Sequence, residues 1–327
     1  MRELTFTAAA REGLDEEMAR DPRVFVVGQG IGARGGNFNT TTGLYDKYGP
    51  ERLRDVTIAE RGFTGLCTGA AMTGTRPVVD YMFFDFALDA LGELINQTAK
   101  IQYMSSGRIP MPIVLRGCIG AGGASATHHS GSYYNIFVNM AGFRVVVPTT
   151  PRDAKGLLKT AIRCDDPVVF MEHKALLNLK GPVPDPEADE LIPFGQARVA
   201  RQGTAATVVA IAAMVPKTLD AAAQLAGEGL EIEVIDPRTL APLDIDTILA
   251  SVHKTGRLLI VDETYAPCGI GGEIAAQVMA RGFDDLDAPV MRLNGPQTPI
   301  PYSPPLEAAV LPNVTTIIAA IRDLLAE

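Results

Sequence analysis

The sequence predicts an α/β fold of two domains, each built on a largely parallel sheet. Short runs of buried-type residues alternate with amphipathic stretches along most of the 327 residues, the order expected of parallel strands joined by helices. From Leu179 to Pro193 this periodicity stops and proline and acidic residues concentrate, which indicates a linker. We therefore expect a first domain over 1–180, a linker over 181–195 and a second domain over 196–327.

In the first domain the helix starts are the clearest signals. Residues 5–20 fit an amphipathic helix opened by Thr5 and stopped before Asp21-Pro22. Thr150 precedes Pro151, and proline is favoured at the first helical position, where its missing N–H costs nothing. Further helices are expected at 89–104, 133–140 and 153–163, and strands at 23–28, 77–84, 111–116, 143–147 and 167–172.

The second domain repeats the alternation of strand and helix. Asp244 is an N-cap residue type in front of an apolar run, and Gly269-Ile-Gly-Gly-Glu273 opens another helix. The remaining strands are expected at 206–212, 231–235, 257–262 and 290–293, and the helices at 215–228, 244–253 and 314–326.

Composition excludes some classes of partner and site. The net charge of −9 argues against nucleic acid or an anionic membrane surface, because both require a concentrated basic patch. Cys67, Cys118, Cys164 and Cys268 lack the close pairing of a zinc site, so we expect free buried thiols. The charged, amphipathic N-terminus fits neither a signal peptide nor a membrane span, and we expect a cytoplasmic protein.

The stretch from Thr57 to Phe86 carries the strongest chemical signal. Glu60 leads into a helix rich in glycine and alanine, which a flat ligand or another backbone can approach closely. Asp85-Phe86 follows a buried strand, at the sheet edge where ligands of open α/β folds bind. An alternative stays open at this point: Thr57 and Glu60 also fit a capping box, in which both side chains satisfy free helix amides.

A second glycine motif, Gly28-Gln29-Gly30-Ile31-Gly32, is similar to a dinucleotide-binding turn. That turn needs a helix directly after it, whereas residues 33–40 have loop composition. We therefore do not expect a nicotinamide cofactor.

Several collinear blocks point to one family. They are Asp21-Pro-Arg-Val-Phe, Lys47-Tyr-Gly-Pro-Glu-Arg, Ile58-Ala-Glu-Arg-Gly-Phe, Gly74-Thr-Arg-Pro-Val, His129-Ser130, Asp153-Ala-Lys-Gly-Leu and Pro299-Ile-Pro-Tyr-Ser-Pro-Pro-Leu-Glu. From Thr5 to its C-terminus the chain resembles the beta subunit of the thiamine-diphosphate-dependent decarboxylating component of 2-oxo acid dehydrogenase complexes, of pyruvate, branched-chain or acetoin type. The resemblance implies a transketolase-like pyrimidine-binding domain followed by a transketolase C-terminal domain.

The resemblance assigns the cofactor-binding residues. The carboxylate of Glu60 would hydrogen-bond N1′ of the aminopyrimidine of thiamine diphosphate and promote activation of the cofactor. This role requires an acid that can exchange a proton with the ring nitrogen across a short hydrogen bond. Ile58, Met82 and Phe86 would line the same pocket, although Met82 and Phe86 are also ordinary core residue types. Gln29 stands where the family usually has a glutamate, so a neutral amide replaces a carboxylate near the cofactor.

His129 is the second catalytic residue that the resemblance implies. It would face the substrate channel and assist acyl transfer to a lipoyl arm, a role that suits a side chain with a pKa near neutrality. His128 is adjacent, but the family motif is His followed by Ser, so we expect His128 to be a loop residue without chemistry.

Metal ions and partners also follow from the resemblance. Some members bind a structural potassium ion, and the corresponding positions are Ile113, Ala161, Ile162, Cys164 and Asp166. The chain contains no Gly-Asp-Gly, the motif that holds Mg²⁺ and diphosphate in thiamine-diphosphate enzymes. We therefore expect an alpha subunit to supply most of the Mg²⁺ site.

Our leading hypothesis is the beta subunit of an α₂β₂ 2-oxo acid or acetoin dehydrogenase, with a second beta subunit and a lipoyl-bearing dihydrolipoyl acyltransferase as further partners. One alternative is a split transketolase-type ketol transferase, in which Arg34, Arg108 and Arg116 would bind a sugar phosphate. Another is a catalytically altered or scaffolding homologue, suggested by Gln29.

Overall fold

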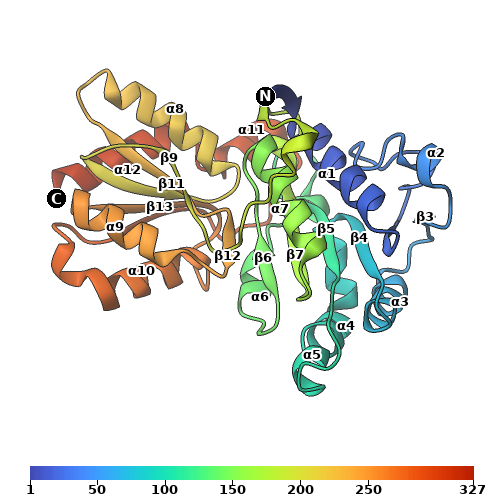
Figure 1. Cartoon of the computed structure of the whole chain (residues 1–327). Helices are drawn as coiled ribbons and strands as arrows, with labels where there is room; N and C mark the ends of the chain where they lie inside the picture. The colour runs from blue at the N-terminus through green and yellow to red at the C-terminus, as the bar shows by residue number, and fades with distance from the viewer. The chain divides into compact units, whose positions relative to one another are not determined.

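The computed structural model describes all residues from Met1 to Glu327, and the chain divides into two compact units (Figure 1). The first comprises residues 1–119 and 136–194, and the second comprises residues 120–135 and 195–327. The segment 120–135 therefore lies between two pieces of the first unit in sequence but belongs to the second unit by its contacts.

The first unit contains a parallel sheet, as expected. The first unit contributes six parallel strands to it, in the spatial order β6 (Arg144–Val146), β7 (Val168–His173), β5 (Val114–Ile119), β4 (Arg76–Phe83), β2 (Val24–Gly28) and β3 (Leu53–Asp55). Every residue of β5 and β7 is buried, which explains why most of their residues are apolar.

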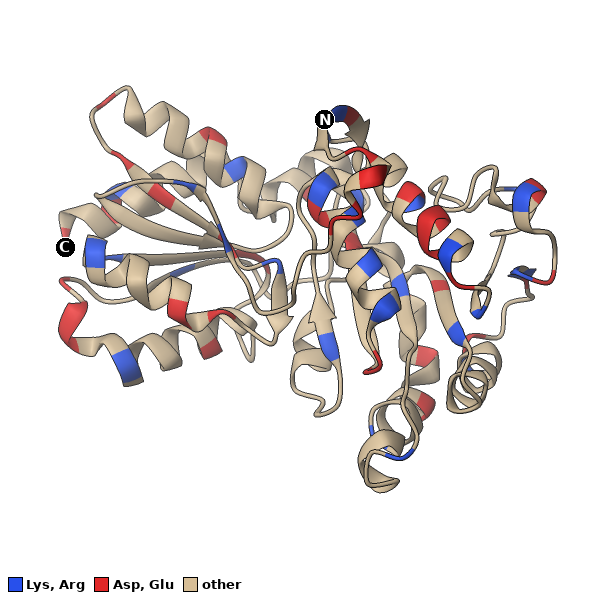
Figure 2. Ribbon diagram, viewed as in Figure 1, with Lys and Arg blue, Asp and Glu red and all other residues tan.

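Helices α1 (Phe6–Arg20) and α7 (Pro151–Arg163) begin where the sequence predicted. The side chains of Thr5 and Thr150 accept hydrogen bonds from Ala8 N and Asp153 N, and Pro151 occupies the first turn of α7. The two helices contact each other, and Figure 2 shows acidic and basic positions on both. Four ion pairs of 2.6 Å join them: Lys155 pairs with Glu12 and Glu16, Lys159 with Glu16, and Arg163 with Glu17.

Two expectations for the first unit were wrong. The helix expected at 89–104 is a series of short turns, η1 (Phe84–Ala90), α4 (Leu91–Glu93), the π-helical η2 (Leu94–Thr98) and α5 (Ile101–Met104). Thr98 donates its hydroxyl hydrogen bond to Glu93 O at 3.2 Å, in competition with the regular helical pattern. Part of the expected linker is a strand, β8 (Lys180–Val183), which pairs antiparallel with β1 (Arg2–Thr5).

The second unit also contains a mainly parallel sheet. Its order is β14 (Met291–Gly295), β13 (Leu258–Tyr265), β10 (Ala206–Ala210), β11 (Ile232–Asp236) and β9 (Arg198–Arg201), of which only β9 is antiparallel to its neighbour. The helices include α8 (Met214–Ala226), α9 (Ile245–Thr255), α10 (Ile270–Gly282) and α12 (Val314–Ala326). Asp244 caps α9 by accepting from Thr247 N at 3.1 Å, as predicted.

Shorter elements complete the two units. They are α2 (Leu44–Tyr48), α3 (Glu60–Met72), η3 (Thr127–His129), α6 (Tyr134–Val138), η4 (Lys174–Leu176), η5 (Pro186–Ala188), β12 (Thr239–Ala241), η6 (Phe283–Asp285) and α11 (Pro304–Ala309).

One stretch, Pro304–Ala326, is long and apolar enough to cross a membrane by length and composition alone. It consists of two helices, α11 and α12, interrupted around Pro312. Ile317, Ile321 and Leu324 of α12 are buried, and α12 contacts α8, β13 and β14. One face of α12 is therefore part of the core of the second unit.

Candidate active site

Glu60 is the first residue of α3, and its side chain is buried. The N-cap is Ala59, no side chain caps the helix, and Thr57 is exposed. The capping-box alternative is therefore wrong. A carboxylate at this position is favoured by the positive end of the helix dipole.

The side chain of Gln29 contacts Glu60 directly. Gln29 Nε2 donates to Glu60 Oε1 at 3.0 Å. The loop that carries Gln29 is fixed by Asp55, whose carboxylate accepts from Gly30 N at 2.7 Å and Gly32 N at 3.2 Å. Gln29 therefore orients one oxygen of Glu60 and leaves the other available to a second donor.

Met82 has a left-handed backbone conformation, with φ of 66°. Asp80 stabilises this turn, because its Oδ1 accepts from Met82 N at 2.8 Å while its Oδ2 accepts from Thr40 Oγ1 at 3.0 Å. The Met82 sulfur contacts the side-chain amide of Asn37. Such strain in a non-glycine residue is typical of functional sites.

Phe86 and Ile58 differ in their surroundings. Phe86 is half-buried in η1, with its ring edge-to-face to Phe83 at 6.2 Å between centroids. Ile58 is 82% exposed, two residues before the buried Glu60.

Arg116 is not available to a phosphate. Its side chain is 1% exposed, and its Nε donates to Glu172 Oε2 at 2.7 Å in a fully buried ion pair. The expectation that Arg116 serves a sugar-phosphate site is therefore wrong, and the pair instead lies in the sheet beside Asp80.

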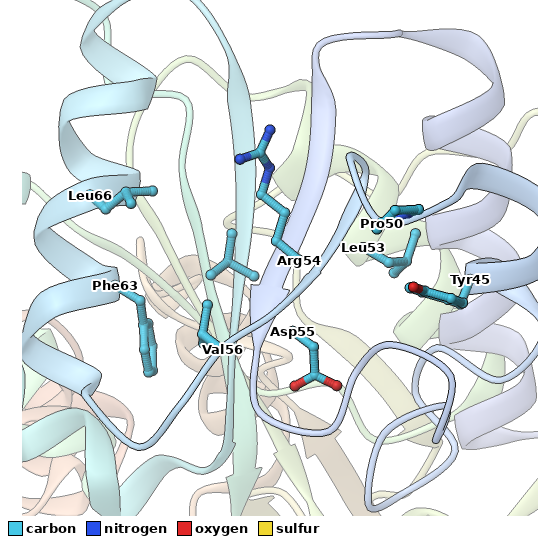
Figure 3. Close-up of a pocket in the computed structure, with 9 residues that line it drawn as sticks. Tyr45, Pro50, Leu53, Arg54, Asp55, Val56, Phe63 and Leu66 are labelled. Atoms are coloured by element: carbon cyan, nitrogen blue, oxygen red, sulfur yellow. The ribbon is translucent and has the colours of Figure 1, made fainter.

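Figure 3 shows a pocket of about 450 Å³ in the first unit. Its lining includes none of the predicted site residues and consists of Val27, Tyr45, Pro50, Leu53, Arg54, Asp55, Val56, Phe63 and Leu66. Asp55 already accepts from the Gln29 loop, and Arg54 pairs with Glu51 at 3.0 Å. We assign this pocket no ligand.

His129 lies in the second unit, in the short turn η3. It is half-buried, whereas His128 is exposed. Ser130 donates to Ala126 O at 2.7 Å, and Ala126 has a left-handed φ of 63°. Two acids that the sequence analysis missed, Glu263 and Glu307, accept hydrogen bonds from the backbone of this loop.

The positions expected for potassium already have protein partners. Arg76 Nη1 donates to Ile162 O and Cys164 O at 3.0 Å each, and Arg144 pairs with Asp166 at 2.6 Å. The carbonyls of Ile113 and Ala161 accept from Val168 N and Cys164 N. Because arginine side chains supply positive charge here, the residues do not fit a dedicated potassium site, and we derive no step through this ion.

The four cysteines are free, but they are not all buried, as had been expected. Cys67 and Cys118 are buried, Cys164 is half-buried and Cys268 is exposed. Burial raises the pKa of the Cys67 thiol to about 12, so this group stays protonated.

Comparison with known proteins identifies the family. Residues 2–180 match the transketolase pyrimidine-binding domain, and residues 195–317 match the transketolase C-terminal domain. The pyruvate dehydrogenase E1 component subunit beta of Rickettsia felis is 42% identical over 322 residues, covering 98% of each chain. The chain belongs to the E1 beta-subunit family.

Other E1 beta relatives extend the range of this family. The acetoin:2,6-dichlorophenolindophenol oxidoreductase subunit beta of Cupriavidus necator is 43% identical over 331 residues, covering 98% of this chain and 97% of its own. A solved structure, a split gene transketolase described as an inactive beta4 tetramer, aligns with a TM-score of 0.81 at 22% identity and covers 99% of both chains. That likeness shows the fold.

Proposed function

We propose that this chain is the beta half of a two-subunit, thiamine-diphosphate-dependent E1 enzyme that acts on pyruvate or acetoin and transfers the acyl group to a lipoyl carrier. The observation that carries the proposal is the buried carboxylate of Glu60 at the start of α3, hydrogen-bonded by Gln29. Relatives named as pyruvate and acetoin enzymes, at 42% and 43% identity, support both substrate classes.

The residues around Glu60 fit an aminopyrimidine. Gln29 engages only Oε1, so Oε2 is available to the ring nitrogen N1′. Met82, Phe86 and Ile58 would supply apolar surface for the ring. Thiamine diphosphate, when bound, supplies the nucleophilic carbon for attack on the 2-oxo group. Glu60 holds the proton that is exchanged with N1′.

His129 would act on the substrate side as a proton donor and acceptor during acyl transfer. Its place on a loop that the second unit holds rigidly supports this role. The partners we propose are an alpha subunit that holds Mg²⁺ and the diphosphate, a second beta subunit, and a lipoyl-bearing acyltransferase. The exposed Ile58 is consistent with cover by a partner chain.

The decisive experiment is reconstitution with the alpha subunit. Substrate-dependent reduction of an artificial acceptor should appear with pyruvate or acetoin and fall about 10²- to 10⁴-fold in Glu60→Gln. Glu51→Gln is the matched control, because Glu51 is an exposed acid whose ion pair involves only Arg54. Turnover that survives Glu60→Gln contradicts the mechanism, and activity with ketose phosphates alone supports the ketol-transferase alternative.

Gln29 favours a second candidate, a scaffolding homologue, because the usual carboxylate is absent. Titration calorimetry of the heteromer with thiamine diphosphate and Mg²⁺ separates the two. Heat of binding supports the enzyme, and its absence supports the scaffold.

We also propose a cytoplasmic location. Relatives from Dictyostelium discoideum and rice are named as mitochondrial proteins, and the bacterial relatives carry no such designation. Fractionation of cells that express the chain with its partner tests this.

A further inference from the structure

The loop that carries His129, residues 120–132, has an unusual backbone. Gly120, Gly122 and Gly123 have φ of 90°, 132° and 75°, and the non-glycine residues Ala124 and Ala126 have φ of 51° and 63°. Successive turns of this kind direct neighbouring N–H groups towards one side, which creates a concave site for an anion. We call residues 120–132 the His129 loop.

The chain fills this anion site with its own carboxylates. Glu307 Oε1 accepts from Gly122 N at 2.9 Å, and its Oε2 accepts from Ala124 N at 3.1 Å. Glu263 Oε1 accepts from Ala121 N at 3.3 Å and from Ser132 Oγ at 2.7 Å. Both acids are 7% exposed, so these charge-assisted bonds are shielded from water.

Glu307 comes from a family block to which the catalytic hypothesis assigns no task. It lies in α11, directly after Pro299-Ile300-Pro-Tyr-Ser-Pro-Pro-Leu, and its own N–H donates to Ser303 O at 2.8 Å. The same block contacts the other end of the loop, because Thr127 Oγ1 donates to Ile300 O at 2.9 Å. The block therefore fixes the His129 loop at residues 122, 124 and 127, the last only two residues before His129.

We infer that Glu307 is a positioning residue for His129. Its two oxygens each satisfy one amide of the loop, so the carboxylate fixes the loop conformation that presents the imidazole to the substrate. The inference rests on the proposed role of His129. It adds that the His129 loop is held in place by Glu307, a residue of the same unit about 180 positions away in sequence.

A double-mutant cycle in the reconstituted enzyme tests this inference. Glu307→Gln keeps the size of the side chain but places an NH₂ against a backbone N–H. We expect kcat to fall about 10- to 100-fold, because misplacement by about 1 Å costs this much, with little change in KM. In a His129→Ala background the same substitution should cause no further loss.

Three outcomes contradict the inference in distinguishable ways. If His129→Ala is fully active, the proposed role of His129 fails and the inference fails with it. If His129→Ala is impaired but Glu307→Gln has normal kcat, only the inference fails. Losses that multiply in the double variant also refute it, because they show that Glu307 acts independently of His129.

Two further variants control for folding. Glu273 is an exposed acid of α10 that bonds only Gln277 within its own helix, so Glu273→Gln should leave activity unchanged.

If Glu307→Gln fails to assemble with the alpha subunit, the experiment uses Glu307→Ala instead, with acetate added during assembly to replace the missing carboxylate. We expect added acetate to restore kcat in the presence of His129 and to have no effect without it. Equal acetate dependence in both backgrounds overturns the inference.

Discussion

The two catalytic candidates are held in place in opposite ways. Glu60 begins a regular helix and is oriented by Gln29, 31 residues earlier in the same unit. His129 lies on an irregular loop oriented by Glu263 and Glu307, through amides separated from these acids in sequence by 142 to 185 residues. The comparison teaches that the residue proposed to exchange a proton with the cofactor can be positioned by a helix N-terminus and one nearby loop. The residue proposed to act on the substrate is positioned by contacts with residues that are distant in sequence.

A large expected effect on turnover tests the local side of this comparison. Glu60→Asp keeps the charge but withdraws the carboxylate by one methylene, so we expect about a 100-fold loss of kcat. Steady-state kinetics of the reconstituted enzyme measure it. An effect no larger than that of Glu51→Gln would show that the position of the carboxylate is not critical.

A second prediction tests a distant contact that has no catalytic role. Glu172→Gln leaves the buried Arg116 guanidinium without its counter-charge, which should lower the free energy of unfolding by about 3–5 kcal/mol. Replacing both residues, Arg116→Met with Glu172→Leu, should restore most of that stability. Denaturant unfolding of the three variants measures this, and an unstable double variant would contradict our account of the ion pair.

The bond between Gln29 and Glu60 gives a smaller, pH-dependent effect. Gln29→Glu places a second carboxylate beside Glu60, and repulsion between the two charges raises the pKa of one of the two acids. The acidic limb of the kcat/KM profile should therefore move to higher pH. An unshifted profile would mean that the hydrogen bond does not form in the assembled enzyme.

The smallest effect concerns Asp21. Hydrogen bonding by Arg23 lowers the pKa of Asp21 to about 2, against 3.8 for the unperturbed group. Because the folded-state pKa is the lower one, this stabilisation is present above about pH 4 and is lost as the pH falls towards 2. Asp21→Asn should cost at most about 1 kcal/mol at pH 7. The exposed Asp46→Asn is its control in acid-unfolding curves.

Local patterns in the sequence predicted most of the fold. The caps at Thr5, Thr150 and Asp244 are confirmed because each depends on residues within one helical turn. The alternation of apolar strands and helices predicted two mainly parallel sheets, because this pattern is also read from neighbouring segments of the chain. The helix expected at 89–104 was wrong because its side-chain hydrogen bonds, such as Thr98 to Thr68, depend on tertiary contacts.

The candidate site was only partly predictable. Glu60 could be selected because it stands in a distinctive block, but its bond to Gln29 could not be inferred from spacing. Glu307 was visible only as the end of the Pro299 block, since a carboxylate that binds backbone amides leaves no trace in the composition of the loop it binds. The left-handed turn of Met82 was hidden for a similar reason, because it depends on the carboxylate of Asp80.

The assignment of residues 120–135 to the second unit restricts how this polypeptide can be engineered. A chimaera joined near residue 195 would combine the His129 loop of one parent with the carboxylates of another. Such a hybrid retains its anchoring only if the donor half carries acids at positions 263 and 307. A fragment ending at residue 194 would keep the histidine but lose every carboxylate that orders its loop. The two family-matched segments, 2–180 and 195–317, can therefore not be exchanged independently of each other. In a chimaera, the His129 loop and the C-terminal domain should come from the same parent.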